Sequence, residues 1–145
     1  IRRGLAKRGA SIEGTGCCTG FYGVSLSTDG LVLGVSMWGA GKIRFYYFDP
    51  ARSLWDMRPE FSATKLEGLS ITDDGNRVVT GNRRYQGNFK EAEVKVYDWN
   101  GVSWLQIGQA IYNEFAGDAA GFVNICGDGN RLSVGSPTHG ADNTG

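Results

Sequence analysis

The sequence contains a strand–turn–strand pattern that occurs three times, and this repetition limits the fold more than any other feature. In each copy, apolar residues such as Val24 and Leu26 alternate with small polar ones before an Asp-Gly pair, and a second short strand follows. Period-two alternation is typical of a strand with one buried face, and Asp-Gly is the strongest short signal for a β-hairpin. The copies span residues 23–36, 68–81 and 122–135, with turn glycines at Gly30, Gly75 and Gly129.

A third and a fourth strand complete the repeat. Residues 42–48 match residues 93–99, and Trp55 and Trp104 occupy the same place after a polar turn. The Asp-Gly pair recurs after 45 and then after 54 residues. Four strands in roughly 45–55 residues is the size of one β-propeller blade. Asp-Gly turns alone would also fit a β-sandwich, but the matched third strand and the matched tryptophans favour a propeller.

The repeat predicts an all-β chain of antiparallel four-stranded blades that forms an incomplete propeller, with about two full blades and two partial ones. Propellers usually close with four to eight blades. We therefore expect either a longer parent protein or copies that assemble through their open edges. The predicted division is residues 1–20 for the last strand of a preceding blade and its connecting loop, 21–67 for the first blade, 68–121 for the second, and 122–145 for the start of a third.

Composition supports this interpretation and excludes some functions. Glycine accounts for 23 of the 145 residues and proline for only three, which fits many tight turns. Fifteen basic residues balance fifteen acidic ones, so bulk charge does not favour a nucleic-acid partner. No run of 18 apolar residues is present, so we expect no membrane insertion.

The chain has three cysteines, Cys17, Cys18 and Cys126, and none stands in a C-x-x-C or zinc-finger spacing. We expect mostly buried thiols. One of them could pair with another cysteine of this chain or with a cysteine elsewhere in a longer parent, and the sequence leaves this pairing open.

Taken together, the motifs resemble integrin-α-like, FG-GAP-related β-propeller repeats, of the array type found in algae and other marine microbes. The matching stretches are Val-Ser-Leu-Ser at 24–27, Val-Lys-Val-Tyr at 94–97, Gly-Val-Ser-Trp-Leu-Gln-Ile-Gly at 101–108 and Asp-Gly-Asn at 128–130. The resemblance implies a cell-surface or extracellular protein whose partners are other proteins or further repeats of the same chain.

Such repeats often carry a calcium loop after the second strand. Calcium needs six to eight oxygen ligands, several of them anionic. The loops after the first two hairpins lack these carboxylates, and only the third offers Asp142 and Asn143. We therefore expect no cofactor, with calcium as an alternative at this third loop alone.

No catalytic set emerges from the sequence. His139, the only histidine, stands near Ser136 and Asp142 in a glycine-rich loop without the G-x-S-x-G turn of a serine nucleophile. The carboxylates Asp73 and Asp74 fit a hairpin turn, and Glu91 and Glu93 fit an exposed strand face. The sequence therefore predicts no enzyme.

One long loop is the best surface candidate, because arginine and tyrosine are enriched at the energetic centres of interfaces. Its alternative is a solvated insertion. The resemblance implies a non-catalytic repeat segment that acts in protein–protein interaction or as a cell-surface or extracellular structural scaffold, and this loop would present its contact surface. The alternatives are a glycan-binding propeller and a self-assembling filament subunit. The loop residues are Arg83, Arg84, Tyr85, Asn88, Phe89 and Lys90.

Overall fold

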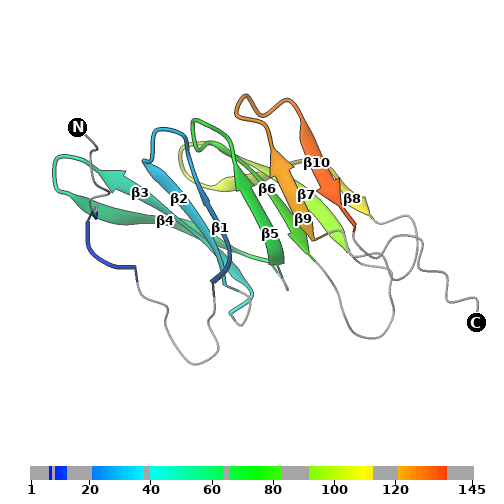
Figure 1. Cartoon of the computed structure of the whole chain (residues 1–145), viewed down its shortest axis with the longest axis horizontal. Coiled ribbons are helices and arrows are strands. Elements are labelled where there is room, and N and C mark those ends of the chain that lie inside the picture. Colours follow the sequence, from blue (N-terminus) through cyan, green and yellow to red (C-terminus); the bar gives the residue numbers. More distant parts are fainter. Residues whose placement is uncertain are drawn as a thin grey trace, which may run out of the picture.

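The computed structural model describes residues 7, 9–12, 21–37, 40–63, 66–82, 92–112 and 121–136. These ranges contain ten strands and no helix (Figure 1). The strands are β1 (Phe21–Leu26), β2 (Val32–Met37), β3 (Lys42–Asp49), β4 (Leu54–Ser62), β5 (Leu66–Ile71), β6 (Arg77–Asn82), β7 (Glu93–Trp99), β8 (Trp104–Tyr112), β9 (Phe122–Ile125) and β10 (Leu132–Gly135).

The strands form two four-stranded antiparallel sheets and a two-stranded one. The first sheet, blade 1, has the order β1-β2-β3-β4, and the second, blade 2, has the order β5-β6-β7-β8. The pair β9-β10 forms the third unit. The sheets stack as an open fan with β1, β5 and β9 next to one another (Figure 1). This arrangement confirms the all-β, incomplete-propeller prediction.

The same kind of hairpin turn joins the first two strands of each unit. In blade 1 the Ser27 hydroxyl donates to Asp29 Oδ1 at 2.6 Å, and the same oxygen accepts from the Leu31 N–H at 2.9 Å. Thr72 with Asp74, and Cys126 with Asp128, repeat this arrangement. The glycine after each aspartate has a φ near +70°, which explains why the sequence needs glycine there. We call this edge of the fan the hairpin-turn end and the opposite edge the loop end.

A repeated serine joins the inner strands of neighbouring units. The Ile71 N–H donates to the Ser25 hydroxyl at 3.0 Å, and the Ile125 N–H donates to the Ser70 hydroxyl at 3.2 Å. The backbone N–H of Asp73 also donates to the Gly127 carbonyl at 3.0 Å. The small hydroxyl in the middle of each inner strand therefore fixes how one blade sits on the next.

The main core lies between blade 1 and blade 2. Phe45 of β3 is fully buried, and its ring lies 4.2 Å from the ring of Trp104. Arg58 opposes Phe45 across β3 and β4. A second cluster lies between blade 2 and the third unit. The buried members of the first cluster are Ile43, Phe45, Leu66, Leu69, Ile71, Val78 and Trp104, and those of the second are Val79, Ala92, Val94 and Ile125.

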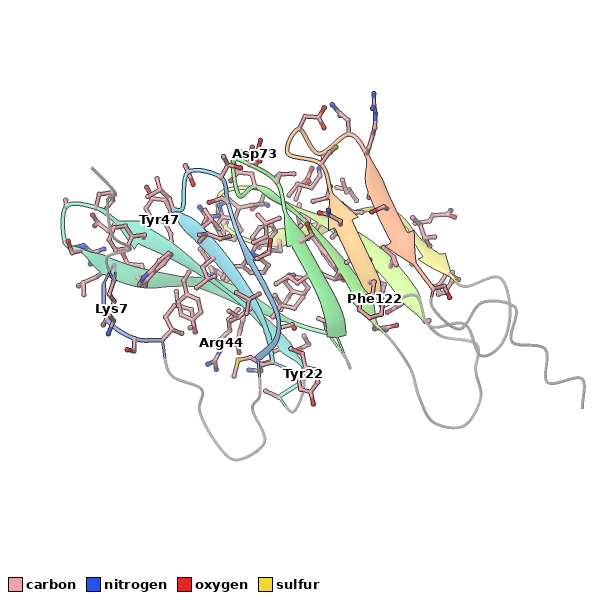
Figure 2. All side chains as sticks on the ribbon, in the orientation of Figure 1. Lys7, Tyr22, Arg44, Tyr47, Asp73 and Phe122 are labelled. Atoms are coloured by element: carbon pink, nitrogen blue, oxygen red, sulfur yellow. The ribbon has the colours of Figure 1, made fainter. Side chains whose placement is uncertain are left out.

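The outer face of blade 1 is open in this structure. Val24 and Leu26 of β1 are 60% and 53% exposed, whereas Leu69 and Ile71, which occupy the same places in β5, are buried against blade 1. Tyr22 is also exposed, and Phe122 is exposed on the third unit; Figure 2 shows both at the loop end, away from Asp73. Blade 1 and the third unit, the two outermost sheets of the fan, therefore both expose apolar surface, as the outermost sheets of an unclosed stack of blades must.

The aromatic residues of β3 are mostly buried. Phe45, Tyr46 and Phe48 are at most 8% exposed, and Tyr47 is 38% exposed. Trp104 is buried, and Trp55 is half-buried against Phe48.

Residues 7 and 9–12 belong to no strand of the three sheets, and Gly9 lies against the Trp55 ring. A strand of a preceding blade would pair within that blade, so the predicted division of the chain stays a prediction.

Candidate functional site

A hollow that is lined by both blades lies between them at the loop end. It encloses about 160 Å³ between the end of β4 and one face of blade 2. The register of β6 and β7 pairs Thr80 with Lys95 and Val78 with Tyr97, so these side chains share the face that looks toward blade 1. We call this hollow the inter-blade cleft. Its lining residues are Ser62, Ala63, Leu66, Thr80, Asn82, Glu93, Lys95 and Tyr97.

An ion pair stands in the cleft. Lys95 Nζ lies 2.6 Å from Glu93 Oε1, and the two side chains are 27% and 24% exposed. The residues are two apart on β7, so both point to the same side of the sheet. The hydrogen bond from Lys95 to Glu93 raises the pKa of the Lys95 ammonium. The cleft therefore presents one firmly protonated amine beside an acceptor carboxylate.

Two buried polar residues of β6 hold this part of β7. The Glu93 N–H donates to Asn82 Oδ1 at 2.8 Å, and the Thr80 hydroxyl donates to the Lys95 carbonyl at 3.4 Å. Thr80 and Asn82 are 3% and 8% exposed. These bonds fix the backbone beneath Glu93 and Lys95, so the ion pair sits on a rigid sheet rather than on a loop.

Tyr97 closes the cleft on the side of the apolar core. Its ring lies 4.4 Å from the ring of Phe61 on β4. Burial raises the pKa of the Tyr97 phenol, and the nearby Lys95 charge opposes part of this effect. The phenol is therefore protonated at neutral pH and can donate a hydrogen bond. With Glu93 and Lys95, the cleft offers an acceptor and two donors suited to an oxygen-rich small molecule.

The same kind of charge cluster occurs on blade 1. Arg44 of β3 stands where Lys95 stands in β7, and its Nε lies 2.8 Å from Glu60 Oε2. Lys42 pairs with the other oxygen of Glu60. The hydrogen bonds from Lys42 and Arg44 hold the pKa of Glu60 below its usual range. A basic side chain at this third-strand position, paired with a glutamate, is thus a feature of both blades.

A second, more open hollow of about 480 Å³ lies at the hairpin-turn end between blade 2 and the third unit. Arg77 spans it with a two-point contact to Asp98 at 2.6 and 2.8 Å and a 3.0 Å bond to the Gly129 carbonyl. Asp74 and Asp128 serve the turns, and Asp73 accepts from the Thr28 hydroxyl. Its charged groups are occupied in holding the units together, so this hollow is a weaker candidate.

The structure places few of the sequence-predicted site residues. The predicted interaction loop, Asp142, Asn143, His139, Glu91, Cys17 and Cys18 lie outside the described residues. Cys126 is free, and its thiol takes the place of the turn hydroxyl. Glu93, expected on an exposed strand face, is half-buried in the cleft. Sequence reasoning missed Lys95, Tyr97 and Asn82, although the match between residues 42–48 and 93–99 already aligned Arg44 with Lys95.

Within the described ranges, no group of three histidine, cysteine, aspartate or glutamate side chains is placed to hold a metal ion. Across these same residues, no helix has the length and hydrophobicity needed to cross a bilayer.

The comparisons with known proteins identify the fold. No protein-family model and no curated protein matches the sequence. Solved structures do match. Hydrazine synthase of Kuenenia stuttgartiensis has a TM-score of 0.57 at 22% identity, over 86% of this chain and 32% of that one. A periplasmic gluconolactonase of Pseudomonas aeruginosa matches with a TM-score of 0.59 at 16% sequence identity, and the match covers 79% of this chain and 36% of that one. A candidate 6-phosphogluconolactonase of Bacteroides uniformis matches with a TM-score of 0.61 at 17% sequence identity, and the match covers 86% of this chain and 36% of that one.

These neighbours are propeller-like proteins, and this chain shares their fold. It spans about a third of the length of each. At these identities the likeness establishes the fold alone, and nothing in it singles out FG-GAP or integrin-type repeats.

The neighbours correct the predicted function. We expected a non-catalytic scaffold because the fold and the motifs resembled repeats of that kind. Proteins named as lactonases share the fold, so a propeller architecture gives no ground for that conclusion. The same finding removes the support for a plain exclusion of enzymes. The error came from passing from fold to function without a site, which a fold used for many functions does not permit.

Proposed function

We propose that the chain is a segment of a propeller enzyme that binds a small, oxygen-rich sugar derivative of the lactone class in the inter-blade cleft. The observation that carries the proposal is the grouping of Glu93, Lys95 and Tyr97 in one hollow where two blades meet. Ligand sites of enzymes are concave and combine an apolar lining with a few convergent polar groups. The likeness to two proteins named as lactonases suggests the substrate class.

The cleft residues suit the hydrolysis of a lactone. The oxygen of a water molecule bonds to the carbonyl carbon, the ring carbon–oxygen bond breaks, and an open-chain hydroxy acid forms. In this proposal Glu93 accepts the proton that the water loses, and Lys95 stabilises the negative charge that develops on the carbonyl oxygen. Tyr97, whose pKa burial raises, donates a proton to the departing ring oxygen, and the proton held by Glu93 then returns to the Tyr97 phenolate, so both groups regain their starting states.

The test is hydrolysis of D-gluconolactone by the purified protein, measured as acid released at constant pH with spontaneous hydrolysis subtracted. We expect Glu93→Gln and Lys95→Met each to lower the rate by about 10²-fold, the usual effect of removing one acid–base or charge-stabilising group. Glu60→Gln is the matched control, because it breaks the analogous ion pair on blade 1 and should keep the rate. Absence of both saturable binding and hydrolysis above background contradicts the proposal.

We also propose that these repeats are related to the FG-GAP type, which the amino-acid sequences of residues 24–27 and 94–97 support. Such repeats often carry a calcium-binding loop, and calorimetric titration of the protein with calcium tests whether this chain has one. Saturable heat that is lost in Asp142→Asn favours the kinship, and an absence of binding contradicts a calcium loop at Asp142 and Asn143.

A further inference from the structure

A half-buried guanidinium lies between blade 1 and blade 2, and none of the carboxylates in the described part of the chain pairs with it. Arg58 of β4 is half-buried, and its Nη1 is inaccessible to solvent and has no hydrogen-bond acceptor among the described residues. Arg44, Arg52 and Arg77 differ from it, because each of them contacts a carboxylate. Burial lowers the pKa of Arg58, and the nearby Tyr47 phenol opposes part of this effect.

Aromatic rings surround this guanidinium. Its central carbon lies 5.5 Å from the centre of the Tyr47 ring on its own blade and 5.0 Å from the centre of the Trp99 ring on blade 2. Rings at this distance stabilise a cation through their negative faces. Neither ring supplies an oxygen or nitrogen acceptor, so Nη1 remains without one among the described residues.

A second donor without an acceptor lies in the same cluster. Trp104 is 8% exposed, and among the described residues its indole N–H has no acceptor. Its ring lies 5.5 Å from the ring of Trp99, which also contacts Arg58. The Phe45 ring packs at a tilt against the Trp104 ring, and Phe45 directly opposes Arg58 across the strands. Two donor atoms that are inaccessible to solvent, one of them on a charged group, therefore belong to one aromatic cluster at the blade interface.

This cluster is distinct from the inter-blade cleft. Arg58 precedes Phe61 on β4, and Trp99 follows Tyr97 on β7. The tilted ring pair of Phe61 and Tyr97 borders the cleft, whereas neither Arg58 nor Trp104 lines it. A ligand of one site would not occupy the other.

We propose that the interface around Arg58 and Trp104 is a binding site for a small oxyanion, which accepts hydrogen bonds from Arg58 Nη1 and Trp104 Nε1. Unsatisfied buried donors are costly, and the cost is larger for a charged one. An oxyanion supplies both the acceptor oxygens and the missing negative charge, whereas water supplies only the former. Arginine favours planar oxyanions such as carboxylates, and phosphate oxygens, as partners.

The test is a titration of the isotope-labelled protein with inorganic phosphate or acetate at an ionic strength held constant with sodium chloride. The ¹H–¹⁵N spectrum reports on each indole N–H, and Trp55, which packs against Phe48 on the other face of blade 1, is the internal control. We expect the Trp104 signal to shift saturably while the Trp55 signal stays in place. Saturation by phosphate alone assigns a phosphate site, and saturation by both anions assigns a general oxyanion site.

Variants separate binding from general salt effects. Arg58→Met should weaken the apparent affinity at least 10-fold, and Arg44→Met, the matched control with a satisfied guanidinium, should leave it unchanged. If Arg58→Met fails to fold, Trp104→Phe keeps a ring and removes one donor, and the Trp99 signal should then report about 5-fold weaker binding, the effect of one hydrogen bond. The proposal is overturned if the Trp104 shift is absent, or is linear in anion, or persists at full strength in Arg58→Met.

Discussion

The ring of Phe45 in blade 1 lies 4.2 Å from the ring of Trp104 in blade 2, and the two planes are tilted by 33°. Both residues are buried, at 0% and 8% exposure. This contact joins the third strand of one blade to the fourth strand of the next. The contact explains why a tryptophan is needed at position 104, which stood out in the sequence only because it matches Trp55 in the repeat.

Replacing Trp104 with alanine should strongly destabilise the protein. The substitution removes the contact with Phe45 and leaves a cavity at the blade interface, which for a buried aromatic residue costs about 3–5 kcal/mol. The free energy of unfolding is measured by urea denaturation. Val102→Ala, at a residue that is 75% exposed, is the control and should stay within about 0.5 kcal/mol of the parent protein. An equally small effect for Trp104→Ala would show that the blades do not depend on this contact.

Stability should fall in acid because the hairpin turns use ionised aspartates. The hydrogen bond from Thr72 and those from Asn76 hold the pKa of Asp74 below its ordinary value of 3.8. A carboxylate with a depressed folded-state pKa stabilises the fold above its unfolded value and loses this contribution as the pH falls through the folded value. The free energy of unfolding should therefore decline below about pH 4.

Asp74→Asn is the variant that isolates this effect. The amide oxygen can still accept the turn hydrogen bonds but does not titrate, so the variant should be less stable at pH 7 and lose less stability between pH 4 and pH 2. Urea denaturation across this range measures both quantities. A variant with the parent's full acid dependence would assign that dependence to other groups.

The sequence carried the fold because its local signals agree with one another. The Asp-Gly turn needs a glycine of positive φ, and Gly30 and Gly75 provide it in the structure. The serine of the repeated Val-Ser-Leu-Ser pattern had no assigned role, yet Ser25 binds the Ile71 N–H of the next blade. Such a bond joins residues 46 positions apart, and only the stacked blades bring them together.

The candidate site was harder to predict, because it depends on register and on which sheet covers which face. Alternation places Glu93 and Lys95 on one side of β7, but it does not reveal that the end of β4 half-covers them. Charged residues that alternate along a strand suggest a solvated face, and the sequence therefore predicts an exposed face for Glu91 and Glu93. Arg58 escaped attention for the same reason, since nothing near it in the sequence indicates that Trp99 of blade 2 packs over it.

A methyl group at Gly68 should disturb the contact between blade 2 and the third unit. A Cβ built there would lie 2.0 Å from the carbonyl oxygen of Gly121, and backbone at that distance must move. Forcing atoms into a packed interface typically costs about 1–3 kcal/mol. Gly68→Ala should therefore unfold at lower urea concentration, and hydrogen exchange should accelerate in β9. Gly135→Ala is the milder comparison, because its nearest neighbour would lie at 3.3 Å. Equal effects of the two substitutions would contradict the close approach at Gly68.

The Tyr97 phenol should ionise at a higher pH than is usual for a tyrosine, and Lys95 should limit the shift. Burial raises the pKa of Tyr97, and the positive charge of Lys95 opposes this by favouring the phenolate. Lys95→Met removes that charge, so it should raise the pKa of Tyr97 further. The titration is followed by phenolate absorbance, and the difference between each protein and its Tyr97→Phe counterpart isolates the one phenol. If Lys95→Met leaves the pKa of Tyr97 unchanged or lowers it, the ammonium does not act on the neighbouring phenol, and the proposed division of roles between Glu93, Lys95 and Tyr97 fails with it.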